Sequence, residues 1–286
     1  MLYLSRFRFP NAETEHSFRM SVKRTCYNTM YPFFVLSKRE FETVEFEPIT
    51  IFYGGNGSGK STALNVIAEK LRLGRDSLYN RSDFFQDYVE LCDCDVDRPY
   101  SPDSRIITSD DVFDFMLNIR SVNEGIDEKR SELFDEYLDA KYSQFRVRSL
   151  DDYERLKTVT SARRLTQSKF VKKNLAENIR EQSNGESAFM YFTDKIRDGG
   201  LYLLDEPENS LSPDRQIKLL KYLEDSARFF DCQFVIATHS PFILSLKHAK
   251  IYDLDGELAA VKRWTELKNV RLYYDFFKEH AKEFEE

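Results

Sequence analysis

The stretch Gly54-Gly55-Asn56-Gly57-Ser58-Gly59-Lys60-Ser61 decides the fold of this chain. It follows the pattern G-x-x-x-x-G-K-[ST], which is typical of a phosphate-binding loop. Its glycines allow a tight turn in which successive backbone N–H groups face one anion. Lys60 adds a mobile positive charge for the β- and γ-phosphates of a nucleotide, and the Ser61 hydroxyl can coordinate Mg²⁺. We therefore predict that residues 54–61 bind nucleotide phosphates.

The residues on both sides of the loop support this prediction. The apolar run Ile49–Tyr53 is typical of a buried strand that leads into the loop. From Ser61 to Leu71, apolar residues recur every three or four positions, which predicts a helix with Thr62 in its first turn. A helix N-terminus strengthens an anion site through its unpaired N–H groups and its dipole. A glycine-rich turn that matches by chance is the alternative, and the flanking elements disfavour it.

Length and composition bound the class of protein. The chain has 286 residues, of which 41% are hydrophobic, and this suits one large α/β domain with room for an inserted lobe. It contains no apolar run of about 18 residues, the length that a membrane helix needs. Residues Met1–Pro10 alternate like a strand and lack the apolar core of a signal peptide. We therefore expect a cytoplasmic protein with no membrane partner.

The four cysteines, Cys26, Cys92, Cys94 and Cys232, are few and scattered. Cys92 and Cys94 form a lone C-x-C without a matching His or Cys pair nearby. Free thiols are the favoured interpretation, and a zinc or redox site is the alternative.

The charge of the chain is unevenly distributed. The net charge is −7, yet the block Arg146–Arg180 contains ten Lys or Arg and four Asp or Glu, a balance of +6. A basic block inside an acidic chain suggests a contact surface, with nucleic acid as one candidate partner. A solvated helical face is the competing interpretation, because exposed charges contribute little energy.

The pattern along the chain predicts an α/β order of elements. Short strands are expected over residues 1–53, a mostly irregular segment over 74–105, and a short strand over 105–108. Residues 110–182 contain no proline and are predicted to be helical. The apolar runs 201–204 and 234–237 are typical of buried parallel strands. A strand at 251–254 with a turn at 255–257, and an amphipathic helix over 267–286, complete the prediction.

Two strand ends carry further candidate site residues. The strand Leu201–Leu204 ends in Asp205 and Glu206, where Asp205 is placed to hold Mg²⁺ and Glu206 to polarise an attacking water. His239 follows the next strand, where it can reach the γ-phosphate of the nucleotide. An acidic turn and a locally bonded histidine are the plain alternatives, and the phosphate loop makes them less favoured.

A fourth segment, Ser183-Asn184-Gly185-Glu186-Ser187, precedes a predicted helix over 187–196. A Ser-x-Gly turn at the start of a helix exposes N–H groups and a hydroxyl to an anion. Alone, the segment would be read as a simple helix cap.

The order of these motifs resembles the ABC-type ATPase family, in its SMC-like, stand-alone bacterial branch without coiled-coil arms or membrane domains. The resemblance rests on Ser-x-Gly-Glu-Ser, Leu-Tyr-Leu-Leu-Asp-Glu-Pro-Glu, Leu-Ser-Pro-x-Arg-Gln and Ala-Thr-His-Ser-Pro. It covers most of the chain and is weakest over residues 74–170.

The resemblance implies a head-to-tail homodimer that encloses two ATP molecules with Mg²⁺. The phosphate loop with Thr62 would bind ATP in one subunit, and the signature turn of the other would reach the same ATP. In that turn Ser183 and Gly185 would contact the γ-phosphate, with Asn184 and Glu186 beside them. Residues 208–212 would be the loop through which the two sites sense each other.

One position of the family pattern stays open. A glutamine after a strand usually links Mg²⁺ to the helical lobe. Gln86 has the right residue type but lies close to Lys60 in sequence, whereas Asp110 has the better spacing and the wrong type. The residue that stacks on adenine is not assigned either.

The predicted fold is a single α/β domain of ABC type with N-terminal antiparallel strands, a mainly parallel core sheet and an inserted helical lobe. The nucleotide-binding core is predicted over 1–109 and 188–286, and the lobe over 110–187, ending in the signature turn.

The predicted function is a Mg²⁺-dependent ATPase whose ATP-bound dimer switches a separate effector, for example in antiphage defence. Glu206, His239 and Lys60 are its predicted catalytic residues. The alternatives are an SMC-like DNA-maintenance ATPase, the nucleotide-binding subunit of a transporter, and an ATP sensor without turnover.

Overall fold

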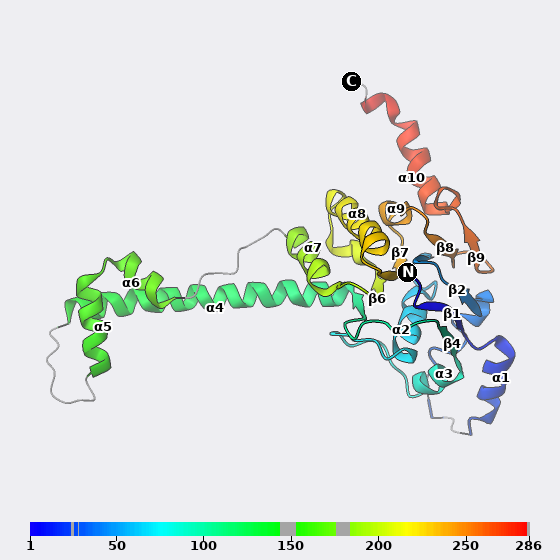
Figure 1. Ribbon diagram of the computed structural model, residues 1–286, viewed down its shortest axis with the longest axis horizontal. Coiled ribbons are helices and arrows are strands. Elements are labelled where there is room, and N and C mark those ends of the chain that lie inside the picture. Colours follow the sequence, from blue (N-terminus) through cyan, green and yellow to red (C-terminus); the bar gives the residue numbers. More distant parts are fainter. Residues whose placement is uncertain (24–25, 28, 144–152, 176–183, 285–286) are drawn as a thin grey trace. The chain divides into compact units, whose positions relative to one another are not determined.

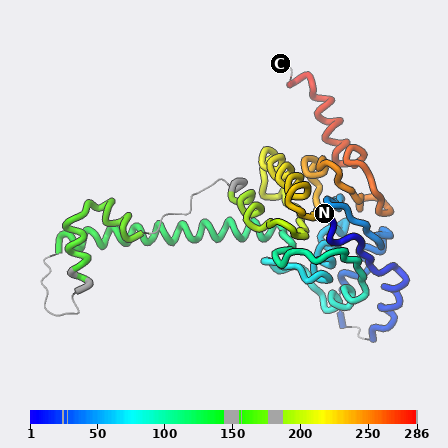
Figure 2. The backbone as a smooth tube through the Cα atoms, viewed as in Figure 1, coloured from blue at the N-terminus to red at the C-terminus, as the bar shows by residue number. Residues whose placement is uncertain are grey.

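A computed structural model describes residues 1–23, 26–27, 29–143, 153–175 and 184–284, and Figures 1 and 2 trace its backbone. Its strands are β1 (Leu4–Arg8), β2 (Thr43–Glu45), β3 (Ile49–Tyr53), β4 (Asp93–Val96), β5 (Arg105–Thr108), β6 (Leu201–Asp205), β7 (Gln233–Thr238), β8 (Lys250–Asp253) and β9 (Ala260–Lys262). Its α-helices are α1 (Ala12–Ser21), α2 (Lys60–Lys70), α3 (Phe85–Leu91), α4 (Ser109–Tyr142), α5 (Tyr153–Arg164), α6 (Gln167–Asn174), α7 (Asn184–Lys195), α8 (Pro213–Phe229), α9 (Pro241–Leu244) and α10 (Lys268–Glu279). The short 3₁₀ helices are η1 (Ser37–Arg39), η3 (Pro207–Ser210), η4 (Trp264–Glu266) and η5 (Ala281–Phe284).

The larger sheet has the strand order β5-β6-β7-β3-β8-β9. Its pairings from β5 to β8 are parallel, and β9 joins the edge antiparallel to β8. Tyr53 pairs with Thr238, and Asp205 pairs with both Thr108 and Ala237, so the carboxyl ends of these strands lie at one edge. The prediction of a mainly parallel core sheet is confirmed, and this edge is where an open α/β sheet binds ligands.

A smaller antiparallel sheet has the order β2-β1-β4, which confirms the predicted N-terminal antiparallel strands. Buried Gln233, at the start of β7, ties the two sheets together. Its side-chain oxygen accepts from the N–H groups of Tyr3 and Leu4, at 2.7 and 2.9 Å, and its amide donates to the Leu4 carbonyl at 2.8 Å. Each polar atom of this buried side chain is therefore satisfied, as a stable core requires.

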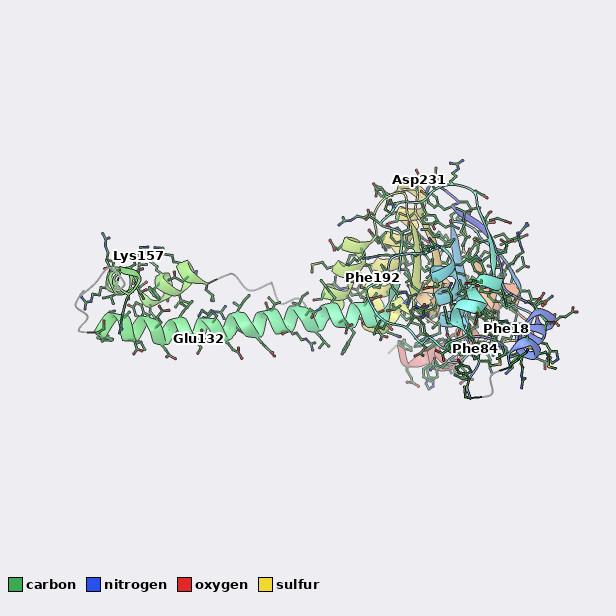
Figure 3. The ribbon with its side chains drawn as sticks, turned by 90° about the horizontal axis from the view of Figure 1, so that it is seen from below. Phe18, Phe84, Glu132, Lys157, Phe192 and Asp231 are labelled. Carbon is green, nitrogen blue, oxygen red and sulfur yellow. The ribbon has the colours of Figure 1, made fainter. Side chains whose placement is uncertain are left out.

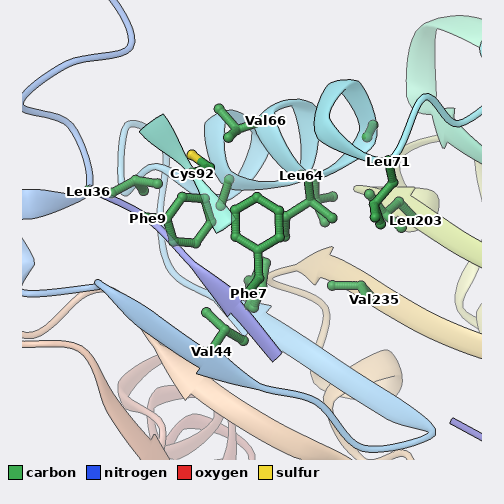
Figure 4. Packing of buried hydrophobic residues seen from close by; sticks show 14 of the residues in the cluster. Phe7, Phe9, Leu36, Val44, Leu64, Val66, Leu71, Cys92, Leu203 and Val235 are labelled. Carbon is green, nitrogen blue, oxygen red and sulfur yellow. The ribbon is translucent and has the colours of Figure 1, made fainter. Parts of the chain in front are cut away.

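Helix α2 packs in the core between the two sheets. Phe7 lies in β1 of the smaller sheet, and Phe9 follows directly after that strand. Figure 4 shows both rings near Leu64 and Val66 of α2. Leu203 and Val235 of the larger sheet belong to the same buried cluster. The packing fixes α2 against the strands, and so fixes the phosphate loop at its N-terminus.

One prediction about local structure was wrong, and another missed two short elements. Residues 12–21 form α1 rather than a strand, because Asn11 caps the helix by accepting from the Thr14 N–H at 2.9 Å. The segment 74–105, predicted as mostly irregular, contains α3 and β4. Strand β4 is acidic and was not recognised by its pattern, because its pairing depends on Arg8 of β1, which bonds Asp93 and Asp95 at 2.9 Å each.

The described chain divides into two compact units, Met1–Phe113 with Asn184–Glu286, and Asp114–Ser183. The first unit contains both sheets. The second contains most of α4, all of α5 and α6, and a small core of its own that includes Tyr137 and Phe170. Among the described residues, no helix combines the length and apolar character needed to cross a membrane.

Candidate functional site

The phosphate loop joins β3 to α2 at the carboxyl edge of the parallel strands. Gly59 is the N-cap of α2 with φ +99°, and a Cβ there would lie 2.9 Å from a methyl carbon of Leu36. A Cβ on Gly54 would lie 2.5 Å from the Ser58 hydroxyl oxygen. Side chains at either position would collide with the loop or its support, so both glycines are required by this backbone path.

Lys60 lies almost wholly buried at the base of the loop. Its Nζ donates to the carbonyl oxygens of Gly54 at 2.6 Å and Gly55 at 3.0 Å, and stands 3.5 Å from Oε1 of Glu206. The buried hydroxyl of Ser58, in the same loop, has no hydrogen-bond partner in the described structure. A buried donor without a partner is costly, and an anion bound in the loop would supply one.

Ser61 and Asp205 form the candidate Mg²⁺ site. The Ser61 hydroxyl donates to Oδ1 of Asp205 at 3.0 Å, which brings two oxygen ligands together from α2 and β6. Burial, and to a smaller extent the charge of Glu206, raise the pKa of Asp205 to about 6 against the lowering effect of the Ser61 hydrogen bond. A divalent cation favours the ionised carboxylate and would reverse that shift.

Glu206 follows directly after β6 in a left-handed conformation, with φ 49° and ψ 55°. Pro207 begins the 3₁₀ helix η3, in which Asn209 donates to Oε2 of Glu206 at 3.0 Å. The other carboxylate oxygen, Oε1, lies near Lys60 and 3.7 Å from Nδ1 of His239. A left-handed backbone conformation is uncommon for a residue other than glycine. At this strand end, the conformation of Glu206 directs its carboxylate toward the loop.

Glu208 is a site residue whose anchoring role the sequence pattern does not indicate. Its carboxylate is buried, and Oε1 accepts from the Thr238 hydroxyl at 2.6 Å and from the N–H groups of His239 at 3.0 Å and Ser240 at 3.2 Å. It therefore fixes the turn that carries His239. The spacing Asp-Glu-Pro-Glu contained the signal, but the sequence could not show which backbone groups the second glutamate binds.

Two contacts from the C-terminal part of the chain also hold the site. Asp255 accepts from the Gly55 N–H at 2.7 Å, and Asn269 at the start of α10 donates to the His239 carbonyl at 3.0 Å. A cavity of about 630 Å³ opens beside the loop and is lined by Gly54–Asn56, His239 and the first turns of α10. The size is that of a small-molecule site.

The remaining candidates lie in different places. Ser183 lies outside the described residues, and Asn184, Gly185 and Glu186 lie in the first turn of α7, which begins three residues before the predicted start at Ser187. Gln86 is exposed on α3, and Asp110 is exposed in the first turn of α4, directly after β5.

Between these last two candidates, position in the sheet favours Asp110 over Gln86. Thr108, at the end of β5, pairs with Asp205, so the segment after β5 starts beside the candidate Mg²⁺ ligands.

The predicted residues Lys60, Ser61, Asp205, Glu206 and His239 are thus brought together at one edge of one sheet. Thr62, the next residue in α2, has its hydroxyl oxygen 3.1 Å from the Tyr31 hydroxyl, which donates to it. The cradle of loop N–H groups, the partnerless Ser58 hydroxyl and the paired oxygens of Ser61 and Asp205 fit a nucleotide with Mg²⁺. The fold and this geometry define a P-loop nucleotide-binding domain.

Comparison with known proteins agrees with that class. Residues 93–245 match the family described as "AAA domain, putative AbiEii toxin, Type IV TA system", and the chain belongs to this family. A search among curated proteins found no match. The predicted kinship with stand-alone P-loop ATPases is confirmed by the family match.

Solved structures give weaker likenesses. The Smc head domain bound to a ScpA domain, from Pyrococcus furiosus, has 14% identity and a TM-score of 0.40, covering 84% of this chain and 95% of its own. The SMC head domain from Thermotoga maritima has 12% identity and a TM-score of 0.40, covering 92% and 99%. The dimeric ATP-binding cassette MJ0796 bound to ADP and Pi has 14% identity and a TM-score of 0.38, covering 79% and 90%.

Proposed function

We propose that this chain is a cytoplasmic Mg²⁺-dependent ATPase whose ATP-bound homodimer switches a separate effector. The main support is the position of the site residues at one edge of the sheet. The phosphate loop, both acids at the end of β6 and His239 after β7 all lie there. Lys60 lies 3.5 Å and His239 lies 3.7 Å from the same oxygen of Glu206. Such a cluster of a cation, an acid and an imidazole beside a phosphate loop suits phosphoryl transfer to water.

In this proposal each side chain has one task. Lys60 turns from the loop carbonyls to the β- and γ-phosphates, and Ser61 and Asp205 hold Mg²⁺, which when bound neutralises phosphate charge. Glu206 orients the attacking water, because its carboxylate is the strand-end acid nearest Lys60. His239, whose backbone is held by Glu208 and Asn269, reports whether the γ-phosphate is present.

The dimer is the part of the proposal that rests on the resemblance. The signature segment 183–186 would reach the ATP of a second copy, and a two-fold arrangement closes with two ATP molecules between the subunits. ATP can favour this dimer only through its higher affinity for the closed state. The family description names a "putative AbiEii toxin" of a toxin–antitoxin system, which supports a role in such a system.

The mass of the Glu206→Gln variant tests the switch. The variant keeps the shape of the site but loses the carboxylate, so it should bind Mg-ATP, hydrolyse it at least about 100-fold more slowly, and accumulate as a dimer. Light scattering with and without Mg-ATP measures this, and Lys60→Ala is the control that should remain at the nucleotide-free mass. A Glu206→Gln variant that stays monomeric in saturating Mg-ATP contradicts the shared site.

The effector can be identified in the same material. Tagged Glu206→Gln, purified from its host with Mg-ATP, should retain the effector, and Lys60→Ala should retain less of it. Equal recovery by both variants would mean that the partner does not read the nucleotide state.

A nucleic-acid-binding ATPase is the second candidate function. It is favoured by residues 153–175, which carry seven Lys or Arg and one Glu. Binding through phosphate contacts should weaken steeply with salt. Titration of labelled DNA at two salt concentrations measures this, and a flat response or no binding removes the candidate.

A further inference from the structure

The second compact unit contains a pocket that the proposed ATPase chemistry does not use. It has a volume of about 740 Å³ and is lined by three of its own helices, α4, α5 and α6. The size falls within the range of small-molecule sites, about 300–1,000 Å³. All of its lining residues lie within this unit, so the pocket belongs to it alone.

The α5 side of the pocket is a single helical face. Lys157, Ser161 and Arg164 line it at spacings of four and three residues, so they lie on one side of the helix. The two cations are two turns apart, a rise of roughly 10 Å along the axis. The hydroxyl of Ser161 lies between them in sequence and is available for hydrogen bonding in either direction.

Helix α6 supplies a third cation and part of an apolar floor. Lys173 lines the pocket one turn from Phe170, which is buried against Leu133 of α4 and Leu165 in the core of the unit. Neither Lys173 nor Arg164 forms an ion pair with another described residue. Within the described part of the chain, these two cations are therefore open to an anion.

Helix α4 also carries acids in this unit. Glu132 is paired with Lys129 on its own helix at 2.7 Å, and Figure 3 shows Glu132 on α4 and Lys157 on α5. Among the described residues, Glu136 is the one acid that lines the pocket. A lone carboxylate repels simple anions, but it can accept hydrogen bonds from the hydroxyl or amino groups of a ligand.

We propose that this pocket binds a nucleotide, with its phosphates on Arg164 and Lys173 and its sugar or base on Glu136 and the apolar floor. Inorganic phosphate has no sugar or base to place on Glu136 and the apolar floor. A nucleic-acid strand would use a broad surface that includes exposed Lys169 and Lys172, which do not line the pocket. The convergence of cations, hydroxyls and one acid in a concave site favours the small ligand.

The test uses the full chain carrying Lys60→Ala, so that the phosphate loop does not contribute, in the presence of EDTA. The probes are ATP, GTP, CTP, UTP, inorganic tripolyphosphate and a labelled single-stranded DNA, measured by calorimetry or fluorescence anisotropy. At least one nucleotide should bind with one-to-one stoichiometry and more tightly than tripolyphosphate. Arg164→Ala with Lys173→Ala should weaken nucleotide binding at least about tenfold. Lys169→Ala with Lys172→Ala should leave the nucleotide affinity unchanged.

Glu136→Gln keeps the test decisive if the double variant does not fold. Removal of this negative charge should tighten tripolyphosphate binding and reduce the preference for the nucleotide, a gain that misfolding cannot produce. Absence of nucleotide binding, equal binding of tripolyphosphate, or DNA binding that falls equally in both double variants would each overturn the proposal. Because Lys60 is already replaced, none of these outcomes depends on the proposed ATPase.

Discussion

The phosphate-loop edge and the α4–α6 pocket both gather charged side chains, but they hold them in different ways. At the loop edge, Lys60 and Glu208 are buried and bonded to backbone groups of neighbouring turns. In the pocket, Arg164 and Lys173 are exposed on α5 and α6, and neither side chain forms an ion pair with a described residue. The first arrangement is fixed before a ligand arrives, whereas the second has its charge in place but its side chains unrestrained.

This difference predicts that substitutions at the phosphate-loop edge reduce stability and activity strongly, whereas substitutions in the pocket have smaller effects. A buried polar group whose partner is removed costs its full desolvation, whereas an exposed charge costs little.

Lys60→Ala should abolish ATP hydrolysis to below about one-hundredth of the wild-type rate and remove measurable Mg-ATP binding. The ammonium is the cation nearest the loop carbonyls and Glu206, so its loss leaves phosphate charge unneutralised. Steady-state hydrolysis and nucleotide titration measure both. The thermal midpoint without nucleotide serves as the control for folding, and hydrolysis that survives in a folded variant would show that the site lies elsewhere.

Glu208→Ala should lower the free energy of unfolding by about 2–4 kcal/mol, because two backbone N–H groups and the Thr238 hydroxyl lose their acceptor. It should also slow hydrolysis about tenfold by loosening the turn that carries His239. Glu208→Gln retains an acceptor oxygen and should recover part of both losses. Denaturant unfolding and hydrolysis rates, measured together, separate the two effects, and a Glu208→Ala variant as stable as the wild type would refute the anchoring role.

The raised pKa of Asp205 predicts two opposite dependences on pH. Between about pH 4 and pH 6 the folded state binds more protons than the unfolded state at this group, so the stability of the nucleotide-free protein falls as pH rises through that window. Mg²⁺ binding requires the carboxylate, so Mg²⁺-dependent nucleotide affinity should rise by up to about tenfold per pH unit below pH 6 and then level off.

Asp205→Asn is the matched control for both dependences, because it removes the titrating proton and keeps the side-chain shape. Thermal midpoints and Mg²⁺ titrations from pH 5 to about pH 8 should lose their Asp205-dependent slopes in this variant. Slopes that persist unchanged would assign them to another group.

Much of the fold follows from short patterns. The phosphate loop, the strand before it and the helix after it are contiguous in sequence, so local rules predict them. The parallel strands β6 and β7 are apolar throughout because both faces are covered, and this too is visible in sequence. Those strand ends bring Asp205, Glu206 and His239 to the loop.

The supports of the site were not predictable in the same way. Asp255 reaches Gly55 across 200 positions of sequence, a contact that only the neighbouring strands β3 and β8 create. Helix α1 was missed because its buried residue is an acid: Glu15 accepts from the Phe34 N–H at 2.8 Å and from the Ser37 hydroxyl, and burial raises its pKa. Hydrophobic patterns treat such a residue as exposed.

The smallest expected effect completes the contrast between the two regions. Arg164→Ala with Lys173→Ala, made in the otherwise unchanged chain, should leave the rate of ATP hydrolysis within about twofold of wild type, because these exposed side chains are not part of the phosphate-loop edge and contribute little to stability. The free energy of unfolding should change by less than about 1 kcal/mol. A large loss of hydrolysis rate or of unfolding free energy would mean that Arg164 and Lys173 stabilise the fold. The contrast with the buried, bonded residues of the phosphate-loop edge would then fail.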